Sequence, residues 1–151
     1  MTARAATQEP VASESRDAAI GFTLTQNYMI GRTASYCFED LGRPDTPKEF
    51  VAGWQKQNSK HYSAAITYMN RRLAEAESLT GVEGKNNIAN ALLAAVRKNG
   101  DKAVNGFFEN KDKHDECKKV IGLMESGAFN IDSRIPMYGE LEALVNYIDG
   151  H

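Results

Sequence analysis

Apolar residues recur at steps of three and four positions along most of this chain, which is the spacing of one buried face of an α-helix. The first stretch of this kind predicts a helix over residues 15–41. Gly31 and Ala34 lie on its apolar face, and these small residues would allow another helix to approach closely. Gly42 and Pro44 are expected to end the helix, because glycine commonly follows the last helical turn and proline cannot continue it.

The clearest start signal in the chain precedes the second helical stretch. Thr46 is a good N-cap residue, Pro47 suits the first helical position, and Glu49 completes a T-x-x-E capping box. The helical period then continues to about Thr80, before Gly81. We therefore expect one long amphipathic helix here, which would be the spine of the fold.

Three further helical regions follow. The pattern predicts a helix over residues 85–98 that stops at Gly100, and a region over 104–127 that breaks at 110–112. A last helix is predicted to start near Pro136. No alternating strand pattern exceeds three or four residues. The sequence therefore predicts an all-α fold, a bundle of four to six helices.

The helical domain is expected to span residues 15–151 as one domain, preceded by a flexible tail over residues 1–14. The tail is polar and contains Ala3-Arg4-Ala5, which resembles the A-x-A pattern of a signal-peptidase site. Two interpretations stay open. Either a secretory signal peptide stood upstream in the natural protein and Met1 replaces it, or this is an ordinary flexible tail.

Composition and net charge limit the classes of function that this chain can have. The chain has 151 residues, of which 42% are hydrophobic and 25% charged, values that are ordinary for a globular protein. A net charge of −2 argues against a dedicated nucleic-acid binder, which carries a strong basic excess. No apolar run approaches the roughly 20 residues of a membrane-spanning helix. We expect neither a nucleic-acid partner nor a membrane span.

The chain contains two cysteines, Cys37 and Cys117, each on or beside a predicted apolar stripe. Their wide separation excludes a C-x-x-C redox motif and a c-type haem site, and two cysteines cannot form a four-cysteine zinc centre. They are either small buried hydrophobic residues or a disulfide. A disulfide would tie the end of the first helix to the fourth helical region. It would contribute about 4.5 kcal/mol on a chain-entropy estimate and place the protein in an oxidising compartment.

A resemblance to a protein group extends over residues 35–127. It is carried by Cys37, Pro47, Phe50, Trp54, Gln57, Asn58, Tyr62, Cys117 and Gly127. The arrangement resembles small helical periplasmic proteins of proteobacteria, in which a cysteine precedes a helix with a W-x-x-R/Q-N element and a second cysteine lies downstream. Some such proteins, among them immunity proteins against type VI secreted amidases, neutralise toxins by binding them. The resemblance implies a periplasmic protein with a disulfide and a protein partner, and it transfers no binding-site residue.

Candidate catalytic and metal-binding chemistry is sparse. His61 lies on the apolar stripe of the second helix with Asn58 and Tyr62 nearby, so these three residues are a candidate pocket. A general base also needs a partner that orients it, and Asn58 bonded to His61 is equally well a satisfied polar pair at the edge of the core. In the segment 111–117, His114 has no second histidine motif beside it, and the acids there suit a helix start. We expect no catalytic residue, no metal and no cofactor.

The segment 128–136 is the best candidate for recognition. Phe129 and Ile131 are apolar residues in a connection between helices, and Arg134 follows them. Such residues either fold back as a plug or contact a partner.

The leading hypothesis from the sequence is a non-enzymatic, secreted or periplasmic protein. It would act by binding a protein, as an immunity protein or inhibitor of a toxin or cell-wall enzyme. Alternatives are a homodimer formed through a bundle face, a purely structural envelope protein, and a small ligand carrier or enzyme with an interhelical pocket near His61.

Overall fold

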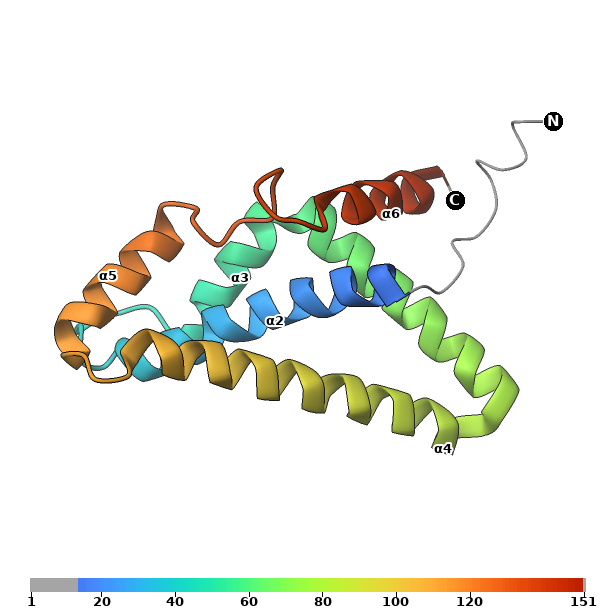
Figure 1. The fold of residues 1–151 in the computed structure, drawn as a ribbon, viewed down its shortest axis with the longest axis horizontal. Coiled ribbons are helices and arrows are strands. Elements are labelled where there is room, and N and C mark those ends of the chain that lie inside the picture. Colours follow the sequence, from blue (N-terminus) through green and yellow to red (C-terminus); the bar gives the residue numbers. More distant parts are fainter. Residues whose placement is uncertain (1–13, 151) are drawn as a thin grey trace. The chain divides into compact units, whose positions relative to one another are not determined.

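The computed structural model describes residues 14–150 and contains five helices in that range (Figure 1). These are α2 (Glu14–Cys37), α3 (Pro47–Gln57), α4 (Ser59–Phe108), α5 (Lys113–Glu125) and α6 (Tyr138–Gly150). No strand occurs in this part of the chain, which confirms the predicted all-α class. The tail predicted over residues 1–14 and its A-x-A pattern lie outside the described residues, apart from Glu14, which begins α2.

The described residues form two compact units, and α2 and α4 run through both. Unit 1 consists of residues 14–23, 59–93 and 131–150, and unit 2 consists of residues 24–58 and 94–130. The buried residues of unit 1 include Ile20, Ala65, Tyr68, Ile131, Leu141 and Leu144. Those of unit 2 include Ile30, Ala34, Trp54, Val104, Ile121 and Met124. Each unit thus has its own apolar core.

The start of α3 forms as the capping signal predicts. The Thr46 hydroxyl accepts a hydrogen bond from the backbone N–H of Glu49 at 3.1 Å, and Pro47 occupies the first helical position. The same hydroxyl donates to the Glu49 carboxylate at 3.1 Å. One of the otherwise unpaired N–H groups at the helix start is thereby satisfied.

The predicted spine helix over residues 47–80 is interrupted at Asn58, so that prediction was wrong. Asn58 has φ −109° and ψ 23° and separates α3 from α4. Its side-chain amide donates to the carbonyl of Trp54 at 2.9 Å and to the side-chain oxygen of Asn130 at 3.2 Å. The buried amide therefore caps the end of α3 and anchors the segment after α5, instead of continuing the apolar stripe.

Two glycines of α4 have different structural roles. Gly81 has φ 79°, a left-handed conformation that glycine adopts without strain, and it is the bend between the two arms of α4 in Figure 1. The stop predicted at Gly100 was wrong, because the helix continues through it to Phe108. Gly100 is buried, and a Cβ there would lie 2.3 Å from Cδ1 of Tyr28. Glycine serves at this position to let the tyrosine ring approach.

The break predicted at residues 110–112 is confirmed. Asn110 has a positive φ of 58°, and Asp112 caps α5 by accepting a hydrogen bond from the N–H of Asp115 at 2.9 Å. Asp115 and Glu116 occupy the first turn of α5, where acids complement the helix dipole. The acidic cluster at residues 111–117 thus contributes to the start of a helix.

Unit 2 is cross-linked covalently. Cys37 at the end of α2 and Cys117 in α5 form a disulfide across a sequence separation of 80, and both residues are fully buried. The predicted close approach along α2 is also present, since a Cβ at Gly31 would lie 3.0 Å from a methyl carbon of Val51 in α3. The disulfide is consistent with an oxidising compartment.

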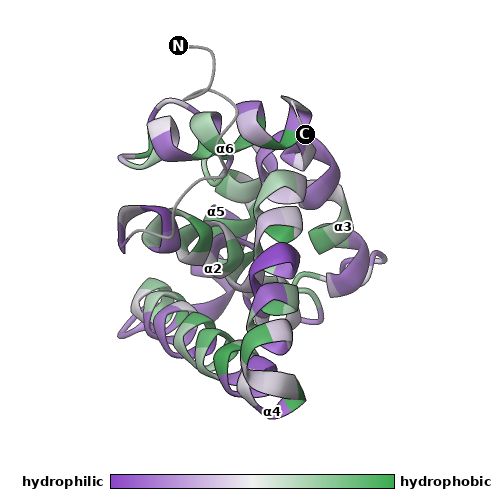
Figure 2. Ribbon diagram, turned by 90° about the vertical axis from the view of Figure 1, so that its right-hand side faces the viewer, coloured by the Kyte–Doolittle hydropathy of each residue, from purple (hydrophilic) through white to green (hydrophobic). Residues whose placement is uncertain are grey.

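Hydrophobic and hydrophilic residues alternate along the helices, as expected of amphipathic helices that each bury one face (Figure 2). Among the helices in residues 14–150, none combines the length and the apolar character that a membrane crossing requires.

Candidate functional site

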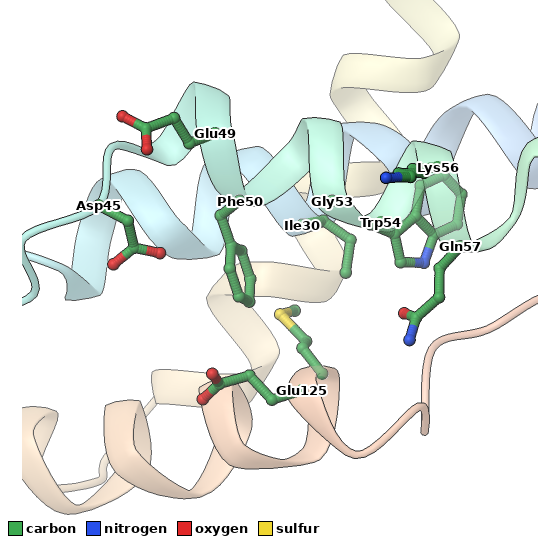
Figure 3. Close-up of a pocket in the computed structure, with 10 residues that line it drawn as sticks. Ile30, Asp45, Glu49, Phe50, Gly53, Trp54, Lys56, Gln57 and Glu125 are labelled. Carbon is green, nitrogen blue, oxygen red and sulfur yellow. The ribbon is translucent and has the colours of Figure 1, made fainter.

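The candidate site is a hollow in unit 2 of about 690 Å³, which we call the α3–α5 hollow (Figure 3). This volume falls within the range of roughly 300–1,000 Å³ that is common for binding sites. Its walls come from α2, from α3 with the turn before it, and from α5. They consist of Ile30, Asp45, Glu49, Phe50, Gly53, Trp54, Lys56, Gln57, Met124 and Glu125.

The floor of the hollow is apolar and its rim is charged. Phe50 extends from α3 toward α5 in Figure 3. Ile30 and Met124, which are buried, line the same hollow. The phenyl rings of Phe50 and Phe38 are in edge contact, with centroids 5.1 Å apart. The exposed rim carries both signs of charge, from Glu49, Lys56 and Glu125. An apolar centre inside a charged rim is the usual layout of a protein-binding surface.

Arg43 holds one end of the hollow together. Its guanidinium donates to both carboxylate oxygens of Asp45, at 2.9 and 3.0 Å, and to Glu125 of α5 at 3.1 Å. The same group lies over the rings of Phe38 and Phe50, at 4.8 and 5.7 Å from their centroids. These bonds raise the pKa of Arg43, and the hydrogen bond from Arg43 lowers the pKa of the Asp45 carboxyl. Asp45 is thereby kept ionised.

The other end of the hollow is closed by Trp54. Its side chain is 5% exposed, and its indole N–H donates to the carbonyl of Phe129 at 3.1 Å. That carbonyl also accepts from the Gln26 side chain of α2 at 3.3 Å. Together with the bond from Asn58 to Asn130, these contacts fasten the segment after α5 to α2 and α3. The walls of the hollow are therefore held in place by contacts within unit 2.

The residues predicted as partner contacts do not form one exposed patch. Phe129 is half-buried and its ring meets that of Phe107 edge-on at 5.9 Å. Ile131 is buried, at 5% exposure. Arg134 is exposed, and its guanidinium forms an ion pair with the Asp132 carboxylate at a shortest distance of 2.7 Å. Of these three residues, only Arg134 is exposed.

His61, one of the candidate pocket residues, lies in unit 1 against α6. Its Nε2 is 2.5 Å from the Glu142 carboxylate, and its ring contacts the ring of Tyr138 at 5.2 Å between centroids. Lys60 also pairs with Glu142, at 3.2 Å. Tyr62 is half-buried, and its burial raises its pKa. This cluster fastens α6 to the start of α4.

The Glu142 carboxylate makes the stability of unit 1 sensitive to acid. Hydrogen bonds from His61, Lys60 and Tyr138 lower its pKa to about 2. Because the folded-state pKa lies below the ordinary value of about 4.3, the stabilisation is complete above that value and is lost as the pH falls toward 2. Glu142→Gln should therefore be less stable than the wild type at pH 7, and this difference should close between about pH 5 and pH 2. Urea unfolding at a series of pH values measures it.

Glu83→Gln is the matched control for this prediction. It removes one carboxylate from an exposed residue that has no ion-pair partner among the described residues. Its unfolding free energy should stay parallel to that of the wild type over the whole pH range. A Glu142→Gln difference that is independent of pH would contradict the assigned role of the carboxylate.

Within residues 14–150, no group of three or more His, Cys, Asp or Glu side chains is placed to hold a metal ion. Sequence reasoning predicted none of the residues that line this hollow or hold it together as site residues; among those it missed are Arg43, Asp45, Met124 and Glu125. An R-x-D pattern joins the first two, but the contact of Arg43 with Glu125 joins segments far apart in the sequence. The sequence contains no signal for that contact.

Comparison of the chain with protein-family models, with curated proteins and with solved structures finds no match.

Proposed function

We propose that this protein is a non-enzymatic binding protein of an oxidising compartment, and that it binds a protein partner through the α3–α5 hollow. The observation that carries the proposal is the apolar floor of Ile30, Phe50 and Met124 inside a rim of mixed charge. An interface of standard size buries about 800 Å² per partner and derives most of its affinity from a few central anchors. An apolar side chain of the partner would be the anchor that enters the hollow.

The rigidity of the walls supports this function. Cys37–Cys117 ties α5 to α2, and Arg43 ties α5 to the turn before α3. A preformed site costs little ordering entropy on binding, so more of the contact energy appears as affinity. The mechanism would be occlusion, in which the bundle covers the active site of a toxin or cell-wall enzyme. The sequence resemblance to small helical periplasmic proteins, some of which are immunity proteins, suggested a partner of this kind.

The chemistry of the hollow favours binding over catalysis. A carboxyl group that acts as a general acid needs a raised pKa, whereas the hydrogen bond from Arg43 lowers the pKa of Asp45. The Glu125 carboxylate accepts a hydrogen bond from the same Arg43 guanidinium. The alternative, a carrier or enzyme with a pocket at His61, has less support. The bond to Glu142 would suit a general base, but His61 is only 6% exposed and lines neither the α3–α5 hollow nor the hollows beside Ile88 in unit 1.

Gly53→Arg is the sharpest test of the hollow. Gly53 lies in its wall and is exposed, and a Cβ added there would have no atom within 4 Å, so the arginine should fold in place and fill the mouth. Immobilised protein is incubated with secreted and envelope fractions of the producing organism, and the retained protein is identified by mass spectrometry. Its affinity is then measured by calorimetry. Gly53→Arg should weaken binding at least about tenfold, because a charged side chain would occupy the place of the apolar anchor.

Gly106→Arg is the matched control. Gly106 is also an exposed helical glycine with open space where a Cβ would lie, and the change adds the same charge. It lies in α4, which contributes no residue to the wall of the hollow. This variant should bind like the wild type. Equal binding by both arginine variants would place the interface elsewhere, and the lack of any stoichiometric partner would contradict the proposed function.

A further inference from the structure

A second hollow of unit 2 lies along a different face of α3, between α3 and α2; we call it the α2–α3 groove. Its volume is about 570 Å³, against about 690 Å³ for the α3–α5 hollow. Gly31 and Val51 belong to its apolar part, and the two helices are close together there, since a Cβ at Gly31 would lie 3.0 Å from a methyl carbon of Val51. The groove therefore follows the contact between α2 and α3.

The wall of the groove carries two cations and, among the described residues, no acid. Arg32 of α2 and Lys48 of α3 line it, and both residues are exposed. By contrast, the α3–α5 hollow and the two hollows that Ile88 lines in unit 1 each have at least one acid in the wall. On a chain with a net charge of −2, the groove is a local excess of positive charge.

The donors of these two cations are largely unused within residues 14–150. The ion pair of Arg32 is with Asp101 at 3.6 Å, which is too long for a hydrogen bond. Asp101 accepts instead from the Tyr28 hydroxyl at 2.6 Å. The ammonium group of Lys48 forms no ion pair or hydrogen bond with any described residue. A carboxylate only accepts hydrogen bonds and forms its strongest ones with cationic donors, so it is the group that matches this wall.

The groove and the α3–α5 hollow are neighbours across a low ridge of α3. Ala52 lines the groove, and the next residue, Gly53, lines the hollow; both are exposed. One turn earlier, Lys48 and Glu49 stand in the same relation to the two sites. Because the ridge between the sites consists of the two smallest residue types, one protein surface can cross α3 and enter both.

We propose that the protein partner spans α3 and places an acidic segment in the α2–α3 groove. This inference rests on the proposed function, because it describes the same partner. The apolar anchor enters the α3–α5 hollow, and carboxylates of the neighbouring segment accept hydrogen bonds from Lys48 and Arg32. Complementary charges across an interface raise the association rate and select among partners. The partner is therefore a protein that carries an apolar side chain beside an acidic segment.

The first test uses the full chain and a displayed library of random peptides, so it needs no knowledge of the partner. Peptides are kept if they bind the wild type and Lys119→Glu but do not bind Lys48→Glu. Lys48→Glu should fold, because an acid in the first turn of a helix complements its dipole. Lys119 is the matched control, an exposed lysine of α5, which contributes no residue to the groove.

The retained peptides should be rich in Asp and Glu. Synthetic versions should bind Lys48→Glu at least about tenfold more weakly than the wild type, because the reversed charge repels them. Arg32→Gln should weaken binding about fivefold, since it removes one charge without reversing it. High salt should weaken binding to the wild type, because both cations are exposed.

Three outcomes of this test would overturn the proposal. The first is that no peptide is retained, or that the retained peptides have no excess of acids. The second is that an oligonucleotide of equal charge binds as tightly as the best peptide, since the groove would then recognise negative charge alone. The third is that the wild type self-associates on concentration and Lys48→Glu abolishes this, which would assign the groove to a second copy of the chain.

The second test separates this inference from the proposed function. With the partner that the α3–α5 hollow binds, Lys48→Glu should slow association at low salt and Lys119→Glu should not, because charges at the edge of an interface act mainly on the association rate. Weaker partner binding by Gly53→Arg with no effect of Lys48→Glu would overturn the acidic segment and leave the proposed function standing. Acidic peptides held by the groove, together with equal partner binding of Gly53→Arg and Gly106→Arg, would contradict the role of the hollow alone.

Discussion

Replacing both Cys37 and Cys117 by alanine should lower the free energy of unfolding by about 4 kcal/mol. The disulfide spans a sequence separation of 80, and a cross-link over so long a loop removes much of the conformational entropy of the unfolded chain. Both side chains are fully buried, and alanine avoids the unpaired hydroxyl that serine would place there. Urea unfolding followed by circular dichroism gives the difference. This loss is a large part of the roughly 5–15 kcal/mol that is typical of a domain.

The control is the wild type after reduction. Reduced wild type and the double alanine variant should have similar unfolding midpoints, and the m-value of both should exceed that of the oxidised protein, because the uncrosslinked chain exposes more surface. A loss below about 1 kcal/mol would contradict the cross-link as the main restraint on the unfolded chain. The same reduction should weaken the proposed binding of a protein partner, since Met124 and Glu125 of α5 line the α3–α5 hollow.

The parts of the fold that the sequence predicts are those set by local interactions. The capping box at Thr46 and Glu49 involves residues three apart, and the break before α5 follows from an Asx cap at Asp112. Gly81 ends its helical arm as expected, because glycine adopts the positive φ of that bend without strain. In each case the residues that decide the local structure lie within a few positions of one another, so the sequence contains all that is needed to predict it.

The errors occur where a distant segment decides the local structure. Asn58 is on an apolar helical stripe, yet Asn130 lies within hydrogen-bond distance of its amide and the helix ends there. Gly100 has the sequence of a helix stop, but the Tyr28 ring occupies the space that a side chain would need, and the helix continues. Neither neighbour can be identified from hydrophobic periodicity.

The candidate site was not predicted, for the same reason. None of the residues predicted as partner contacts or as a pocket lines the α3–α5 hollow, and Phe50 and Trp54, which do, carried only the resemblance to periplasmic proteins. The opposite wall comes from α5, whose position depends on the disulfide and on the bond from Arg43 to Glu125. A site built from two helices far apart in the sequence cannot be assembled from the pattern of either helix alone.

Trp54→Ala should cost about 3–5 kcal/mol of unfolding free energy, which is the usual effect of truncating a buried tryptophan. The side chain is 5% exposed, and the indole N–H donates to the Phe129 carbonyl. The truncation leaves a cavity between α3 and the segment after α5 and removes one of the bonds that fasten this segment. Thermal and urea unfolding followed by circular dichroism measure the loss, since the chain has no other tryptophan to report by fluorescence.

Trp54→Phe separates the two contributions. Phenylalanine keeps much of the apolar volume and loses the N–H, and the Phe129 carbonyl still accepts from Gln26 at 3.3 Å. We therefore expect this variant to lose less than half as much stability as Trp54→Ala. A cost below about 1.5 kcal/mol for alanine would contradict the tight packing of Trp54. Trp54 belongs both to the core of unit 2 and to the wall of the hollow. Weaker binding of the proposed partner by Trp54→Ala would therefore reflect loss of structure as much as loss of contact. Gly53→Arg, which leaves the core intact, isolates the contact.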